Sequence, residues 1–193
     1  YTLSLHDALP ISYKHGQMDG PATWYYEHGK IRMEANYEKG HLQGEMVRYF
    51  RNGKVENRAF YRMDTLEGEM RQYDEEGGFL LESTQYLHGK KQGRYVCYHD
   101  GEQKMVEGSY CEDEYDGEWT YWDVNGFVVG RARFHKGEGV LEAYDDRDSV
   151  IRRVTYLHSQ KEGKEVSYDR NGAIERTVYY KKGRIVNPPV EVQ

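Results

Sequence analysis

Cysteine, proline and long apolar runs are scarce in this sequence of 193 residues. No apolar stretch is long enough to span a bilayer. Hydrophobic residues make up 37% and charged residues 31% of the chain, a balance that predicts no large central core. The 27 Lys and Arg are interspersed with 33 Asp and Glu, for a net charge of −6. Because no basic stripe is present, the sequence argues against a nucleic-acid partner and, more weakly, against docking on anionic lipid.

The two cysteines and the aromatic content narrow the class further. Cys97 and Cys111 occupy different places in the repeats described below, so no repeated disulfide staple exists. We predict two free thiols, with a single bridge between them as the open alternative. Aromatic residues reach 14%, with 19 Tyr and 21 Gly but only 4 Pro, a composition unlike that of disordered chains. This mixture favours many thin β-units that each bury a little tyrosine surface.

The first twelve residues, YTLSLHDALPIS, match none of the repeats that follow. Residues 1–11 resemble the translation of a common sequencing adapter, so we exclude residues 1–12 from the fold and expect them to add no stability. The open alternative is a genuine apolar N-terminal strand. On the adapter interpretation the natural N-terminus is missing, and the compartment is not fixed by the sequence. We expect a cytoplasmic protein, with the cell envelope as the alternative.

An internal repeat begins at residue 13. An aromatic residue begins each unit: Tyr13, Tyr37, Tyr61, Tyr86, Tyr110, Phe134, Tyr156 and Tyr180. The distances between successive members of this series are 24, 24, 25, 24, 24, 22 and 24 residues. Three residues later stands a turn former, usually glycine. A second glycine follows, which is Gly20 in the first unit. Five residues beyond this glycine each unit has a large aromatic: Tyr25, Tyr49, Tyr73, Tyr98, Trp122, Tyr144 and Tyr168. This recurrence in seven units predicts a repeat protein.

Each unit has a tight-turn signal near its middle, followed by a strand with apolar and charged residues in alternation. The signals are His28-Gly29, Asn52-Gly53, Gly77-Gly78, Asp100-Gly101, Asn125-Gly126, Asp148-Ser149 and Asn171-Gly172. Since Asn-Gly and Asp-Gly supply positive φ angles, we expect two-residue hairpin turns here. The sixth unit is two residues short, which we assign to the loop between Gly137 and Gly139.

The predicted fold is all-β: an elongated, single, twisted antiparallel sheet of seven stacked β-hairpins of about 24 residues, spanning residues 13–186, with a tail at 187–193. Four turn positions lack the expected glycine and are predicted to mark irregular rungs: Asp64, Asp113, Asp148 and Ser159. The oligomeric state is not predicted.

Two columns of large residues lie on opposite faces of the predicted sheet. The aromatics from Tyr25 to Tyr168 are expected to form a structural ladder, packed rung on rung. The opposite column is Ala22, Met46, Met70, Tyr95, Trp119, Leu141 and Glu165. Because one thin sheet cannot bury both faces, we expect the second column to stay partly exposed and to bind a partner. The predicted partner-binding residues are Trp119, Tyr121, Tyr95, Met70 and Met46.

The sequence gives little support for a catalytic site or a metal site. His15, His88 and His158 recur in one column, but at ~9–10 Å per hairpin they are too far apart to share a zinc ion. Glu45, Glu69 and Glu118 follow the second glycine and resemble a solvated polar column more than an acid–base pair. No nucleophile–base pair is suggested. We therefore predict a protein that is not an enzyme and has no cofactor.

Segments such as 37–45 (YEKGHLQGE) and 49–54 (YFRNGK) resemble the MORN-repeat variant and are similar to repeats of YwqK-type bacterial proteins. The resemblance covers residues 13–186. It implies binding or scaffolding of a protein partner, and an antitoxin that captures a toxin. The alternative is a glycan- or cell-wall-binding module of the envelope. That alternative is less favoured, because adjacent Trp and Tyr residues occur only at 24–26 and 119–122.

Overall fold

The computed structural model describes residues 11–99 and 103–188, and every regular element in these ranges is a strand, which confirms the all-β, antiparallel hairpin fold. The chain divides into two compact units, whose described parts are residues 11–90 and residues 91–99 with 103–188. The predictions for residues 1–10, for the Asp100-Gly101 turn and for residues 189–193 fall outside the described residues. In the part of the chain that the structure describes, no helix has the length and apolarity needed to cross a membrane.

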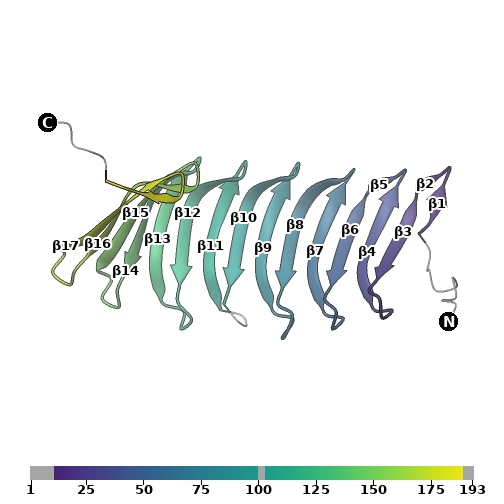
Figure 1. Ribbon diagram of the computed structural model, residues 1–193, viewed down its shortest axis with the longest axis horizontal. Coiled ribbons are helices and arrows are strands. Elements are labelled where there is room, and N and C mark those ends of the chain that lie inside the picture. The colour runs from purple at the N-terminus through teal and green to yellow at the C-terminus, as the bar shows by residue number, and fades with distance from the viewer. Residues whose placement is uncertain (1–10, 100–102, 189–193) are drawn as a thin grey trace. The chain divides into compact units, whose positions relative to one another are not determined.

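The N-terminal unit is a meander in which almost every strand pairs with the next one along the chain (Figure 1). β1 and β2 form a small pair of their own, and β5 pairs with β4 beside β6. The strands are β1 (Tyr13–Lys14), β2 (Gln17–Met18), β3 (Gly20–Tyr25), β4 (Ile31–Glu38), β5 (His41–Leu42), β6 (Gly44–Tyr49), β7 (Val55–Arg62), β8 (Thr65–Tyr73) and β9 (Leu80–Leu87).

The C-terminal unit repeats this plan, and each strand is antiparallel to its neighbours in the sequence (Figure 1). Its strands are β10 (Lys90–Tyr98), β11 (Lys104–Cys111), β12 (Glu114–Trp122), β13 (Val128–His135), β14 (Glu138–Tyr144), β15 (Val150–Leu157), β16 (Gln160–Tyr168), β17 (Ile174–Lys181) and β18 (Arg184–Val186). Cys97 and Cys111 are free thiols, as predicted.

The two-residue turns lie at the opposite end of the hairpins from the one predicted. They follow the opening aromatic, and both central residues have positive φ, as a type I′ turn requires. The pairs are His15-Gly16, Lys39-Gly40, Met63-Asp64, His88-Gly89, Glu112-Asp113, Lys136-Gly137, His158-Ser159 and Lys182-Gly183. The three histidines of the predicted column are therefore first residues of turns.

The mid-unit connections are longer than predicted. At 50–54, the Gly53 amide donates to the Phe50 carbonyl at 2.9 Å and the Phe50 amide donates to the Lys54 carbonyl at 2.8 Å. Gly53 has positive φ whereas Asn52 does not, so the connection is a turn followed by a glycine bulge and not a type I′ turn. The prediction of two-residue turns was wrong for the described sites, where only one of the two predicted central residues has positive φ. We call these connections the hairpin-tip loops.

A backbone hydrogen bond links each type I′ turn to the turn of the preceding hairpin. The amide of the second turn residue donates to the carbonyl two residues past the earlier turn, at 2.7–3.0 Å, except that Ser159 donates to the second residue of the earlier turn. The pairs are Gly40 to Met18, Asp64 to Leu42, Gly89 to Leu66, Asp113 to Lys91, Gly137 to Tyr115, Ser159 to Gly137 and Gly183 to Lys161. We call this series, within each unit, the turn ladder. It fixes the spacing of successive hairpins independently of side-chain identity.

Asp64 and Asp113 are regular members of the ladder, so the prediction of irregular rungs was wrong for them. Ser159 is irregular, as predicted, because its amide donates to Gly137 within the preceding turn. Asp64 and Asp113 have φ of 64° and 71°, within the left-handed region that Asp tolerates. Their carboxylates also accept the amides of Leu42 and Lys91, at 2.7 and 2.8 Å. Each aspartate thus makes a reciprocal pair of hydrogen bonds with the residue that its own amide contacts. This second bond gives a physical reason for Asp in place of Gly.

The short sixth repeat lacks a bulge that is present in β7–β8, β11–β12 and β15–β16. In the β11–β12 pair, Glu107 lies opposite Thr120 but Ser109 lies opposite Asp116, so β12 carries two extra residues there. The same shift occurs in β7–β8 and β15–β16. The β13–β14 pair has an unbroken register from 130–143 to 135–138. The two missing residues are therefore absent from a bulge inside the strand pair. The prediction that they are absent from a loop was wrong.

The missing bulge brings the seventh turn within reach of the fifth. The Ser159 hydroxyl accepts the Tyr115 amide at 2.7 Å and donates to the Glu114 carboxylate. Between them lies Gly137, where an added Cβ would stand 2.7 Å from the Ser159 amide nitrogen. The Tyr115 and Tyr156 rings also approach, with centroids 6.2 Å apart. In this part of the C-terminal unit, the seventh turn is thus bonded directly to the fifth turn.

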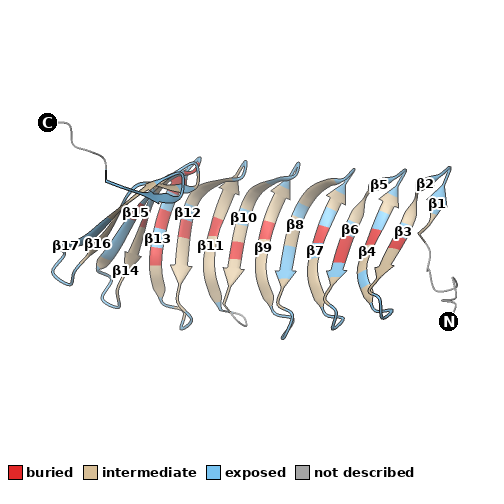
Figure 2. Cartoon of the chain, viewed as in Figure 1, coloured by how far each residue is buried: buried red, intermediate tan, exposed pale blue. Residues whose placement is uncertain are grey.

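The main core lies on one face of each unit and pairs large with small side chains, while Val47 and Val96 are buried on the other face. A small residue, or a valine, stands two places before the six opening aromatics from Tyr37 to Tyr156, and all six are buried: Ala35, Ala59, Thr84, Gly108, Ala132 and Val154. Directly opposite lie larger side chains, as in the pairs Met46–Ala59 and Trp119–Ala132. Figure 2 shows the buried residues as red bands near the middle of the strands. Large rings that lie over small neighbours allow one layer to exclude water.

Replacing Ser159 with Ala is expected to lower the free energy of unfolding by about 1–2 kcal/mol, because the Tyr115 amide loses its acceptor. The matched control is Ser167→Ala in β16, whose hydroxyl makes no hydrogen bond among the described residues. We expect less than about 0.5 kcal/mol there. Urea denaturation of both variants measures the difference, and equal costs would show that the Ser159 bridge does not stabilise this unit.

Candidate binding surfaces

Trp119, the centre of the predicted binding patch, is a core residue. Only 3% of it is exposed. Its ring lies flat on Gly108, where an added Cβ would stand 2.1 Å from the indole. The indole N–H donates to the carbonyls of Ser109 and Asp116, at 3.1 and 3.2 Å. The Tyr115 ring centroid lies 4.6 Å away. The prediction that Trp119 is exposed was therefore wrong, because glycine opposite it leaves room for the ring to fold down.

The other predicted partner-binding residues belong to the same face. Met46 is buried, while Met70, Tyr95 and Tyr121 are half-buried and pack against the two core clusters. Tyr95 meets the Trp119 ring at 5.5 Å between centroids. Burial raises the pKa of the Tyr121 hydroxyl well above its usual range. These side chains contribute to the core, and only their partly exposed edges are open to a partner.

The predicted aromatic ladder lies on the opposite, polar face. All seven members, Tyr25, Tyr49, Tyr73, Tyr98, Trp122, Tyr144 and Tyr168, are half-buried. Among the described residues of either unit, no ring contact joins two of them, so the expected ring-on-ring packing is not observed. Tyr49 and Tyr144 instead donate to the carboxylates of Glu34 and Glu142, at 2.5 and 3.0 Å. The hydrogen bond to Glu34, with burial, raises the pKa of Tyr49 to about 12.

The predicted carboxylate column is a row of ion pairs on the same polar face. Glu45 pairs with Arg58 at 3.1 Å and Glu69 with Arg71 at 2.6 Å, and Glu118 pairs with Arg133. Exposed pairs of this kind are each worth at most about 1 kcal/mol.

The hairpin-tip loops carry a feature that the sequence analysis missed. In four loops an aspartate directly follows the last strand residue, and its Oδ1 accepts backbone amides across the loop. These aspartates are Asp74, Asp123, Asp145 and Asp169. Backbone hydrogen bonds hold the pKa of Asp74, Asp123 and Asp145 below the usual range. The signal in the sequence is an aromatic-Asp pair three or four residues before the loop's glycine or serine.

The fifth hairpin-tip loop displays two apolar side chains. Val124 is 68% and Phe127 70% exposed. Asp123 holds this loop in place, since its Oδ1 accepts the amides of Asn125 and Phe127, both at 2.9 Å. The half-buried Trp122 directly precedes the loop, and Nζ of Lys104 lies 5.8 Å from its ring centroid. A prepositioned, exposed aromatic at the tip of a hairpin is a suitable anchor for a partner.

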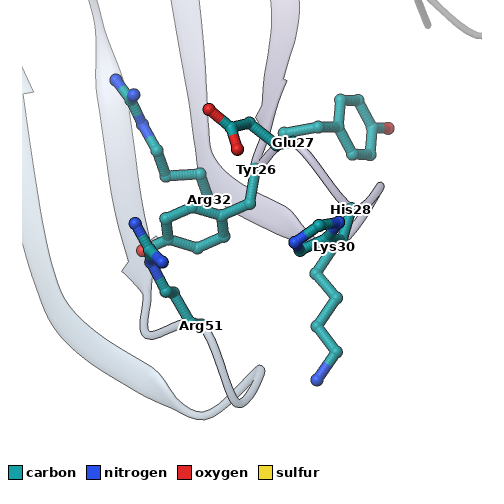
Figure 3. Close-up of a pocket in the computed structure, with 7 residues that line it drawn as sticks. Tyr26, Glu27, His28, Lys30, Arg32 and Arg51 are labelled. Carbon is teal, nitrogen blue, oxygen red and sulfur yellow. The ribbon is translucent and has the colours of Figure 1, made fainter.

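The first hairpin-tip loop borders a hollow of about 400 Å³ with a different chemistry (Figure 3). It is lined by Tyr25, Tyr26, Glu27, His28, Lys30, Arg32 and Arg51. Tyr26 donates its hydroxyl proton to the Tyr49 carbonyl at 2.6 Å, which holds its ring across two hairpins. The Arg51 guanidinium carbon lies 5.8 Å from the centre of that ring.

Comparison with protein families gives a partial match. Three segments match the model of the MORN repeat variant: residues 18–39, 42–63 and 161–182. Each contains one hairpin-tip loop and ends on the first residue of a type I′ turn, so the matches follow the structural repeat. Repeats of this class generally serve as binding modules for proteins or membranes. A comparison with curated proteins found no match.

Replacing Trp119 with Ala is expected to lower the free energy of unfolding by about 3–5 kcal/mol, as for other large core truncations. Trp122→Ala, on the polar face, removes the same side chain from a half-buried site and should cost clearly less. Thermal or urea unfolding of both variants measures the order. A larger loss for Trp122→Ala would restore the original assignment of the core face.

The lowered pKa values of Asp74, Asp123 and Asp145 predict acid sensitivity. A folded-state pKa below the unfolded value of about 3.9 gives a stabilisation that is present above that value and is lost as the pH falls through the folded pKa. The melting temperature should therefore drop below about pH 4. A triple Asp→Asn variant should have a shallower drop between about pH 4 and pH 2. Identical pH profiles for the two proteins would contradict this role of the loops.

Proposed function

We propose that the chain is a non-enzymatic, protein-binding repeat module whose principal contact is the fifth hairpin-tip loop. The carrying observation is the exposure of Phe127 and Val124 on a loop that Asp123 holds in one conformation. Binding to such a loop costs little conformational entropy, because the loop is already ordered. The burial of Trp119 supports this position, since the strand centres are occupied with packing and the tips are accessible.

The electrostatics support a binding role over a catalytic one. A general acid at neutral pH requires a carboxyl with a raised pKa. Six carboxyls of the described residues have a lowered pKa: Asp64, Asp74, Asp123, Asp145, Glu107 and Glu165. Hydrogen bonds and neighbouring cations favour their ionised form. They therefore act as loop caps and ion-pair partners.

We further propose, from the resemblance to YwqK-type proteins, that the partner is a toxin that the chain neutralises. A scaffold that gathers partners uses the same surface, so the identity of the bound protein distinguishes the two roles. Glycan or cell-wall binding is the alternative outcome of the experiment.

The test compares the double variant Val124→Ser, Phe127→Ser with wild type in affinity capture from the source lysate, followed by calorimetry with the captured protein. The control is Ile174→Ser in β17, which changes an equally exposed apolar residue of the same unit. We expect the double variant to lose at least about 2 kcal/mol of binding free energy, as for a hot spot, while the control binds normally.

Three outcomes separate the interpretations. A captured protein that arrests growth, with growth restored by co-expression of wild type but not of the double variant, supports the antitoxin role. Equal binding by wild type and the double variant would remove the fifth loop as the contact. Retention of a cell-wall glycan fraction with no captured protein would replace protein binding by the glycan alternative.

A further inference from the structure

A second site, in the N-terminal unit, goes beyond the proposed function. The hollow at the first hairpin-tip loop is positively charged within a protein of net charge −6. Three permanent cations line it, Lys30, Arg32 and Arg51, against one carboxylate, Glu27. This local excess is opposite in sign to the charge of the whole chain, so the hollow is a local attractor for anions.

Two of the cations that line the hollow are not neutralised by a neighbouring carboxylate in the described part of the chain. Among the described residues, no ion pair joins Arg32 or Arg51 to a carboxylate, and both side chains are exposed. This contrasts with the arginines of the polar face, such as Arg58 and Arg153, which are engaged by Glu45 and Glu142. Figure 3 shows Arg51 beside the Tyr26 ring, with Arg32 and Glu27 toward one side and His28 and Lys30 toward the other.

The ring of Tyr26 gives the hollow a fixed wall. Its hydroxyl is bound to the Tyr49 carbonyl, and Lys30 Nζ reaches the Asn52 carbonyl at 3.4 Å, so the first and second hairpins both hold the site. A guanidinium stacked near an aromatic face keeps its N–H donors directed outward in a planar fork. That fork matches the geometry of a carboxylate.

The next hairpin limits the length of the ligand. Asn52 and Lys54 bind the carbonyls of Glu75 and Glu76, which places the third hairpin-tip loop beside the second. That loop carries Asp74, Glu75 and Glu76, with Asp74 already engaged by backbone amides. A long polyanion that ran along the tips would meet these carboxylates. The surface therefore favours a protein segment with a short acidic stretch over a nucleic acid.

We propose that this hollow binds the carboxylates of a short acidic segment of a protein partner, with Arg32 and Arg51 as the recognising groups. Glu27 sets the affinity by opposing the incoming charge. The site is independent of Phe127 and Val124, so its failure and the failure of the proposed function are distinguishable.

The experiment is an NMR titration of the full chain with end-capped triglutamate, which spans only about 10 Å when extended. End-capped triglutamine is the uncharged probe, and inorganic phosphate is the competing anion. We expect saturable shifts of the amides around 26–32 and 51 with triglutamate only. The variant Arg32→Gln, Arg51→Gln should raise the Kd at least about fivefold, the scale of exposed ion pairs. Arg58→Gln, which removes a paired arginine of the same unit, should leave the Kd unchanged.

Glu27→Gln should tighten triglutamate binding, because it removes the repelling charge. Absence of saturable triglutamate binding, or an equal loss in Arg58→Gln, would overturn the proposal. Tighter binding of phosphate than of triglutamate, with the same dependence on Arg32 and Arg51, would overturn it in favour of a phosphate ligand. Weaker triglutamate binding by Glu27→Gln would contradict an anion site.

Discussion

The hydrogen bond from each type I′ turn to the turn before it is the constraint on which the array depends. It uses only backbone groups, and it forms whether the second turn residue is glycine, aspartate or serine, with the acceptor displaced to Gly137 at Ser159. Because the turn ladder sets the offset between hairpins, the strands can vary in sequence without losing register. Aspartate adds a second bond through its carboxylate, as Asp64 does to the Leu42 amide.

This constraint explains how a single layer can bury a core. With the hairpins held at a fixed offset, a large side chain on one strand lies over a small one on the next, as Trp119 does over Gly108 and opposite Ala132. The polar face is stabilised differently, by tyrosine–carboxylate hydrogen bonds, ion pairs and the buried side chains of Val47 and Val96. The hairpin-tip loops form neither the core nor the bonds of the polar face, so their side chains can differ from one loop to the next. They range from the apolar loop of Phe127 to the cationic hollow beside Tyr26.

The period of the repeat was sufficient to predict the all-β hairpin fold, because glycine, aromatic and turn positions recur together. The end of the hairpin that carries the type I′ turns was assigned wrongly, since Asn-Gly is the stronger local signal whereas the true turns begin with residues such as Lys39 or Met63. The choice of core face failed for a related reason. Counting large residues favoured Trp122, but the small residues at Ala59, Gly108 and Ala132 decide where rings can lie down. Asp123 caps its loop through hydrogen bonds within residues 123–127. Strand periodicity carries no information about the conformation of such a loop.

Native-state hydrogen exchange tests the turn ladder most directly. If the ladder holds the hairpins together, the amides of Gly40, Asp64, Gly137 and Ser159 should be protected to the same degree as mid-strand amides of their own unit. The amides of Val124 and Arg170, in hairpin-tip loops, should exchange rapidly in the same protein. Turn amides that exchange as fast as these loop amides would contradict the account.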